Sequence, residues 1–68
     1  MKKILNALEN QISNFEDLIE SREESFEEKS EKWQESDKGV DYEDMTLNLE
    51  DAKELLQEAI DILEELNN

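Results

Sequence analysis

The sequence predicts an all-α protein: an antiparallel two-helix hairpin that assembles into a homo-oligomeric helical bundle. The 68-residue chain contains no proline and a single glycine, Gly39, near its middle. Apolar side chains recur on both sides of that glycine at intervals of three and four residues, which is the spacing of one helix face. Cysteine and histidine are absent. With no disulfide and no usual metal ligand, association between chains is the remaining way to stabilise so small a domain.

The first helix is expected from about residue 3 to residue 35. Its heptad row consists of Leu5, Leu8, Ile12, Phe15, Ile19, Arg22, Phe26, Lys29 and Trp33. Up to Ile19 this row is purely apolar, as in a packing seam. From Arg22 onward it alternates basic and aromatic side chains. Two cations add little to a packing seam, so the second half of the row indicates a role besides packing.

A loop is expected over residues 36–41, and a second helix from about residue 42 to residue 66. Gly39 can adopt the left-handed conformation that ends a helix, and Asp41 is a favourable N-cap. The main apolar row of the second helix is Met45, Leu49, Ala52, Leu56, Ala59, Leu63 and Leu66. A neighbouring row is Leu55, Ala59, Ile62 and Leu66. A stripe of this width favours contact with two neighbours, as in a four-helix bundle.

The position of the turn predicts an overhang at the start of the first helix. If the turn is centred near Gly39, the numbers of facing residues sum to about 78, and Arg22 lies near Leu56. Residues before about Asn10 then have nothing opposite them, so we expect a second chain to cover them in a dimer or higher homo-oligomer. The predicted interface residues are Ile4, Leu5, Leu8, Ile12, Phe15, Leu55, Ile62 and Leu66. A frayed N-terminus is the alternative.

The charge of the chain limits its partners. Seven basic and 21 acidic residues give a net charge of −14. Such a surface repels phosphates, so neither nucleic acid nor an anionic membrane is expected as a partner. No apolar run approaches a membrane span, and Asn6, Glu9 and Asn10 interrupt any signal-peptide core. We expect a cytoplasmic protein with no targeting segment.

Basic and aromatic residues gather around the expected turn. Aromatic rings can stack on a flat ligand, arginine and lysine bind phosphate or carboxylate, and a helix start offers backbone N–H donors. The candidate ligand-binding residues are Arg22, Phe26, Lys29, Lys32, Trp33, Lys38, Gly39 and Tyr42. A structural explanation is also open, in which Arg22 and Lys29 lay their stems along the core and pair with glutamates while Trp33 caps the bundle.

Carboxylates cover one side of each expected helix. Along a rod they can imitate a phosphate backbone, or they can simply keep a small bundle soluble. Catalysis is not expected, because the chain lacks histidine, cysteine and a glycine-rich phosphate loop. No cofactor is expected either. The spacing of a di-iron bundle or of an EF-hand is missing as well, so we expect no metal site.

The turn itself carries a resemblance. The stretch Ser30-Glu-Lys-Trp-Gln-Glu-Ser-Asp-Lys-Gly39, followed by Tyr42, resembles the centre of a group of very short acidic helical-hairpin proteins of bacteriophages and prophages. Most members have no assigned function. The resemblance implies two activities that are typical of very small phage proteins. Some are sponges that trap a nucleotide signal of a bacterial immune system, and others are inhibitors that bind a host protein, sometimes by mimicking DNA.

Under the sponge hypothesis, the resemblance implies roles for individual residues. Trp33 and Tyr42 would stack on a base, and the four nearby cations would neutralise phosphates. Ser30, Gln34 and Ser36 would donate hydrogen bonds. We therefore expect a non-enzymatic oligomer that sequesters a small anionic, nucleotide-like ligand near the junction of the first helix and the loop, in the host cytoplasm. The alternatives are an acidic protein-binding inhibitor and a purely structural assembly module.

Overall fold

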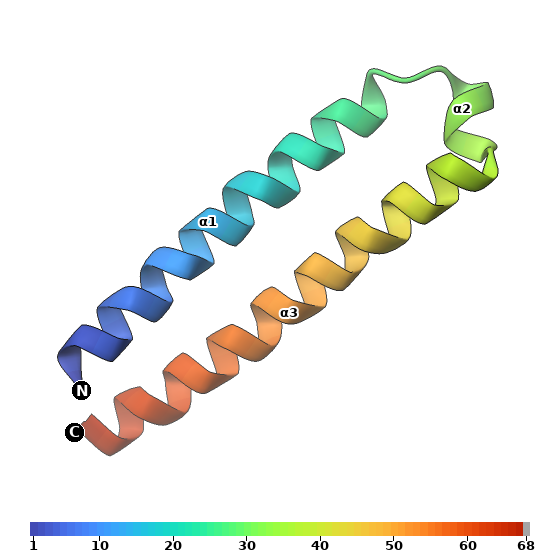
Figure 1. Cartoon of the computed structure of the whole chain (residues 1–68). Coiled ribbons are helices and arrows are strands. Elements are labelled where there is room, and N and C mark those ends of the chain that lie inside the picture. Colours follow the sequence, from blue (N-terminus) through green and yellow to red (C-terminus); the bar gives the residue numbers. More distant parts are fainter. Residues whose placement is uncertain (68) are drawn as a thin grey trace.

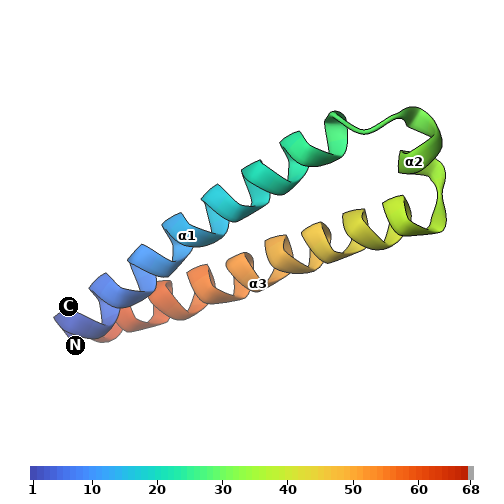
Figure 2. The same ribbon diagram turned by 45° about the horizontal axis from the view of Figure 1, so that its top comes forward.

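The computed structural model describes residues 1–67 and is a helical hairpin (Figure 1). Its elements are α1 (Lys2–Glu27), α2 (Glu31–Glu35) and α3 (Asp37–Asn67). The two long helices pack against each other in opposite directions, and the short helix α2 lies at the corner that joins them (Figure 2). The predicted all-α hairpin is confirmed, whereas its assembly into a bundle stays a prediction.

The first helix is shorter than predicted, because the chain leaves the α1 helix at Glu28 rather than near residue 35. Ser30 then adopts an extended conformation, and its hydroxyl accepts a hydrogen bond of 3.2 Å from the backbone N–H of Trp33. This N-cap begins α2, and Glu31 adds a carboxylate to its first turn, where the helix dipole favours negative charge. The heptad spacing continues across the break to Trp33 and therefore concealed it.

The predicted loop over residues 36–41 is also wrong, because all of it except Ser36 belongs to α3. Ser36 is extended, and its hydroxyl accepts a hydrogen bond of 3.3 Å from the backbone N–H of Gly39. Ser36 is therefore the N-cap of α3. Gly39 is helical with no positive φ, so it does not end a helix, and the predicted N-cap Asp41 lies inside α3.

The real corner gives the hairpin a different register. Arg22 bonds to Thr46, and Glu16 pairs with Lys53, so the numbers of facing residues sum to 68 and 69. Consequently the start of α1 and the end of α3 lie at the same end of the hairpin (Figure 1). The predicted overhang is wrong: Leu5, which was expected to lack a facing residue, is buried.

The two long helices meet along a heptad seam. Every member of the predicted α1 row from Leu5 to Phe26 is buried or half-buried. The α3 side of the seam consists of Tyr42, Thr46, Leu49, Lys53, Leu56, Ile60 and Leu63. The predicted α3 row is thus only partly correct. Its exposed members are Met45, Ala52, Ala59 and Leu66.

The same register corrects half of the predicted oligomer interface. The residues that instead pack within the hairpin are Leu5, Leu8, Ile12 and Phe15. The remaining four are exposed, and their role in assembly stays a prediction: Ile4, Leu55, Ile62 and Leu66. The core is thin, since the buried apolar side chains of residues 1–67 are Leu5, Ile19 and Ile60. Within that part of the chain, no helix combines the length and the hydropathy that a membrane crossing requires.

Candidate functional site

Three aromatic side chains close the corner of the hairpin. Phe26 comes from α1, Trp33 from α2 and Tyr42 from α3. The ring centroids are 6.1 Å apart for Phe26 and Trp33, 6.3 Å for Phe26 and Tyr42, and 5.8 Å for Trp33 and Tyr42. Two of these contacts are edge-to-face and one is stacked, which are the favoured geometries of aromatic pairs. The faces and edges of the three rings are therefore engaged in contacts among the rings themselves.

Arg22 continues the seam just below these rings. Its Nε donates a hydrogen bond of 3.0 Å to the Thr46 hydroxyl, and its Nη2 donates one of 3.0 Å to the Tyr42 carbonyl oxygen. Its guanidinium carbon lies 4.0 Å from the centroid of the Tyr42 ring, a cation–π contact. Thr46 is only 6% exposed, and its hydroxyl also donates to the Tyr42 carbonyl at 3.2 Å. Arg22 thus clamps α1 to α3.

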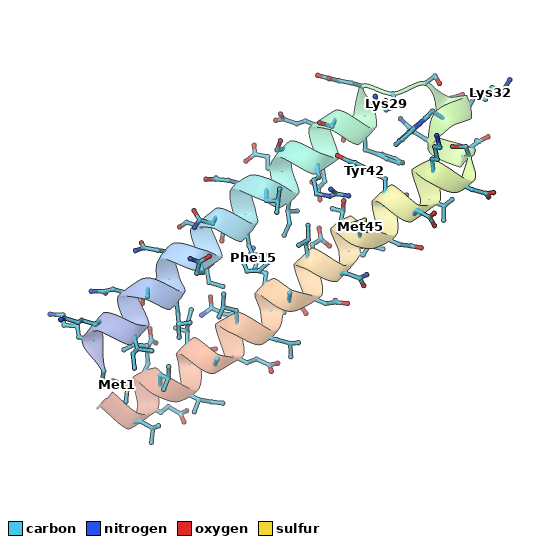
Figure 3. All side chains as sticks on the ribbon, in the orientation of Figure 1. Met1, Phe15, Lys29, Lys32, Tyr42 and Met45 are labelled. Carbon is cyan, nitrogen blue, oxygen red and sulfur yellow. The ribbon has the colours of Figure 1, made fainter. Side chains whose placement is uncertain are left out.

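The three lysines of the predicted site lie further out. The Lys29 ammonium is 5.5 Å from the centroid of the Trp33 ring. Lys32 and Lys38 are exposed, and Lys32 points away from the hairpin whereas Tyr42 lies between the long helices (Figure 3). The structure therefore brings together Arg22 with the three rings, places Lys29 at their rim, and leaves the other two lysines outside the cluster.

Ser36 and Gly39 hold the junction of α2 and α3. The Ser36 hydroxyl and backbone N–H both donate to the Trp33 carbonyl oxygen, the latter at 3.0 Å. A Cβ atom on Gly39 would fall 2.7 Å from the Gln34 carbonyl carbon, and closer still to the carbonyl oxygens of Trp33 and Gln34. Glycine is therefore needed here, because two backbone segments approach each other closely. Ser36 and Gly39 thus both have a structural role at the corner.

The resemblance implied that Gln34 donates hydrogen bonds to a ligand. In the structure its side chain instead caps the C-terminal end of α1. The Gln34 Nε2 donates to the carbonyl oxygens of Phe26 at 2.9 Å and Lys29 at 3.0 Å. The last carbonyls of a helix lack partners within the helix. The amide adds a second donor to the Phe26 carbonyl, which also accepts from the Lys29 backbone N–H at 3.1 Å, and supplies one to the Lys29 carbonyl just beyond the end of α1.

A groove on one side of the seam runs down from this corner. Its upper part is lined by Arg22, Glu23, Phe26, Glu27, Gln34, Glu43, Thr46, Leu47 and Glu50. Its lower part is lined by Glu16, Ile19, Glu20, Glu23, Glu50, Lys53 and Glu54. We call the two parts, which share Glu23 and Glu50, the acidic groove. Its lining contains seven glutamates and two basic residues.

Both basic residues of the acidic groove are engaged by the fold. Arg22 makes the contacts described above, and the Lys53 Nζ lies 3.4 Å from a carboxylate oxygen of Glu16. That ion pair is half-exposed and contributes little to stability, but it occupies the lysine. The charged groups that the groove leaves available to a ligand are therefore carboxylates.

The glutamates on the two walls of the groove repel one another. The pKa of Glu23 is raised above its ordinary value of 4.5, first because its carboxyl shares a hydrogen bond with Glu50, and then through desolvation and the negative charges of Glu50, Glu27 and Glu20. The charges of Glu50, Glu27 and Glu20 contribute to this upward shift, so the carboxylates of the groove repel one another. A cation that entered the groove would relieve this repulsion.

None of the seven glutamates that line the groove was predicted as a site residue, and neither was the buried hydroxyl of Thr46. Their signal was present in the sequence, because each glutamate directly follows a seam residue, and Thr46 belongs to the seam itself.

No protein-family model, no curated protein and no solved structure matches the chain. Within residues 1–67, no group of three or more acidic side chains is arranged to hold a metal ion.

Proposed function

We propose that the protein is a non-enzymatic acidic binding protein, which receives a basic segment of another protein in the acidic groove. The observation that carries this proposal is the composition of the groove, where carboxylates of α1 and α3 face each other on both walls. This corresponds to the protein-binding inhibitor that the sequence raised as an alternative. A cytoplasmic location and a phage origin stay predictions.

The partner's chemistry follows from the charges that line the groove. Seven glutamates against two engaged basic residues attract arginine and lysine side chains and raise their local concentration. The α1 wall from Glu16 to Glu27 is roughly 17 Å long at 1.5 Å per residue. An extended segment of about five residues spans that length, so several basic side chains of one peptide can reach it together. Leu47 and Phe26 add an apolar surface at the upper end for the stems of such side chains.

The same arrangement disfavours the anionic ligand that the sequence analysis ranked first. A phosphate beside Arg22 would also lie beside Glu23, Glu27 and Glu43, which line the same part of the groove. Phe26, Trp33 and Tyr42 contact one another, so a base would have to separate rings that are already packed. Nucleotide capture stays a prediction, so a nucleotide is the second ligand in the titration that tests the proposal.

A peptide titration tests the proposal. We expect an arginine- and lysine-rich peptide of about ten residues to bind with an affinity that falls steeply as salt rises, whereas a neutral peptide of equal length does not bind. Trp33 is the only tryptophan and lies at the upper end of the groove, so its fluorescence reports binding without a label. A small cyclic nucleotide serves as the second titrant. Binding of the nucleotide but not of the basic peptide would overturn the proposal in favour of the sponge.

Two variants of equal charge separate the groove from the overall negative charge. Glu23→Gln with Glu50→Gln removes two carboxylates from the groove, and Glu24→Gln with Glu58→Gln removes two exposed carboxylates outside its lining. We expect about tenfold weaker peptide binding for the first variant, or 1.4 kcal/mol, and less than about twofold for the second. Equal losses in both variants would show that the peptide binds the net charge rather than the groove.

A further inference from the structure

The flank of the seam opposite the acidic groove carries one charged residue, Asp41 before Tyr42 at the corner, and is uncharged along the rest of its length. On α1, the residues that directly precede a seam residue are Ile4, Ala7, Gln11, Asn14, Leu18, Ser21 and Ser25. On α3, the corresponding residues from Thr46 onward, with Leu66 continuing their spacing, are Met45, Asn48, Ala52, Leu55, Ala59, Ile62 and Leu66. Every one of these residues is exposed. Because 41% of the residues in the chain are charged, two such long rows of uncharged positions are a distinct feature of the sequence.

These two rows lie on one face of the hairpin. The acidic groove is lined by residues that follow seam residues on both helices, such as Glu23 on α1 and Glu50 on α3. The residues that precede the seam therefore lie together on the opposite side of it, since both flanks border the same row. We call this second surface the uncharged face.

We propose that the uncharged face is the surface through which a second copy of this chain packs, so that two hairpins form a four-helix bundle. This inference does not depend on the proposed function of the acidic groove. The interface proposed here differs from the predicted overhang, which the structure contradicts. Four of the predicted interface residues, Ile4, Leu55, Ile62 and Leu66, belong to it.

Electrostatics restricts a second copy to this face. Each chain carries a net charge of −14, so two chains repel each other in most orientations. Contact through the acidic groove would bring rows of carboxylates together, which costs several kcal/mol of binding free energy. The uncharged face is the surface along which two copies can approach without opposing carboxylates, and the acidic grooves then point outward.

The size and shape of the face fit a second hairpin. The Cα atoms extend 51 × 15 × 11 Å, so a face of the two larger dimensions has a projected area of about 765 Å². That projection is of the same order as the roughly 800 Å² of accessible surface that each partner buries in a standard interface. Small and large residues alternate along this part of α3, in the order Ala52, Leu55, Ala59 and Ile62. Under two-fold symmetry, the large side chains of one copy can fill the spaces over the alanines of the other.

The thin core gives the association its driving force. Leu55 is 66% exposed, and Ile62 and Met45 are each 59% exposed, whereas the hairpin buries only three apolar side chains within its described residues. A chain of this length without disulfides gains its missing apolar burial most directly from another copy. The uncharged face matches that need, because its α3 row presents the exposed apolar side chains of Met45, Leu55, Ile62 and Leu66 along most of that helix.

Sedimentation equilibrium of two leucine variants tests this inference. Leu55→Glu places a charge on the uncharged face, and Leu47→Glu places the same charge on the acidic side, where Leu47 is 51% exposed. We expect the wild type and Leu47→Glu to sediment as dimers, and the dissociation constant of Leu55→Glu to rise at least about 30-fold. Both leucines are exposed in the hairpin, so circular dichroism should show a helical chain in every sample.

Three outcomes decide the inference. A monomeric wild type at about 100 µM would overturn it, since a dissociation constant above that corresponds to a binding free energy weaker than about 5.5 kcal/mol. Equal dissociation of Leu55→Glu and Leu47→Glu would also overturn it, because the added charge rather than its position would then be responsible. Dissociation confined to Leu55→Glu supports the uncharged face as the interface.

Discussion

Replacing Gly39 with alanine should destabilise the hairpin, although alanine is the better helix former. In an unobstructed helix, Gly→Ala stabilises by up to about 1 kcal/mol. Gly39 is buried, however, and an added Cβ would lie 2.7 Å from the Gln34 carbonyl carbon and closer to two carbonyl oxygens. These atoms are backbone, so they cannot move without shifting α2 and its hydrogen bonds.

The magnitude follows from the price of overpacking. Forcing one extra methyl group into a close-packed site costs about 1–3 kcal/mol, and contacts this close with backbone atoms place Gly39 in the upper part of that range, above the gain of up to about 1 kcal/mol in helix propensity. We therefore expect Gly39→Ala to lower the free energy of unfolding by about 1–2 kcal/mol, with the sign opposite to that of propensity. Displacement of α2 should also move Trp33 away from Phe26 and Tyr42.

Urea unfolding measured by circular dichroism, with Trp33 fluorescence in parallel, gives both quantities. Asn10→Ala is the matched control, because Asn10 is an exposed residue of α1 where alanine should stabilise by a few tenths of a kcal/mol. Stabilisation by Gly39→Ala of the same sign as by Asn10→Ala, with unchanged Trp33 emission, would refute the close approach of α2 to the start of α3.

Three further predictions concern the corner and the groove. Arg22→Lys should lower the free energy of unfolding by about 1–2 kcal/mol in urea, because an ammonium cannot reproduce both hydrogen bonds of the guanidinium fork; no loss would contradict its role as a clamp. Gln34→Ala should cost about 1–2 kcal/mol in the same assay and fray the end of α1, since the carbonyls of Phe26 and Lys29 each lose one donor; an unchanged helix content and stability would argue against this cap. Because the folded state raises the pKa of Glu23, the folded protein binds that proton more tightly, and the resulting stabilisation is present at low pH and lost as pH rises through the raised pKa. Thermal unfolding should therefore show a rising midpoint as pH falls from neutrality toward 4.5, and a smaller rise in Glu23→Gln; identical pH slopes for the two proteins would contradict the repulsion across the groove.

The α1 half of the seam was predictable from sequence because one row alone is apolar there. From Leu5 to Phe26 the spacing is uninterrupted, and the structure buries or half-buries each member. The α3 half was ambiguous, since two rows one position apart both carry large apolar residues. The true row contains Tyr42, Thr46 and Lys53, which made it look the poorer candidate.

The corner was missed because heptad spacing does not record where the backbone leaves a helix. Lys29 and Trp33 keep the spacing, although a break and a new N-cap lie between them. The local signals were two serines, each followed by an acidic residue, at Ser30 and Ser36. Once the corner moved, the register shifted, the overhang disappeared, and Arg22 came to face Thr46.

The aromatic cluster with Arg22 was predictable from the sequence, but the acidic lining of the groove was not. Arg22 and the three aromatic residues do come together. Which glutamates lie around Arg22 depends on the register of α1 against α3. The register predicted from the sequence did not place Glu43 and Glu50 beside Glu23. That difference turns the expected ligand from an anion to a cation.

An amide chemical-shift map tests most directly whether the acidic groove and the uncharged face are separate binding surfaces. In a titration of ¹⁵N-labelled protein with the basic peptide, we expect shifts at groove residues such as Glu20, Glu23 and Glu50, and none at Leu55 or Ile62. Shifts centred on Leu55 and Ile62, or spread evenly over both flanks of the seam, would contradict this separation.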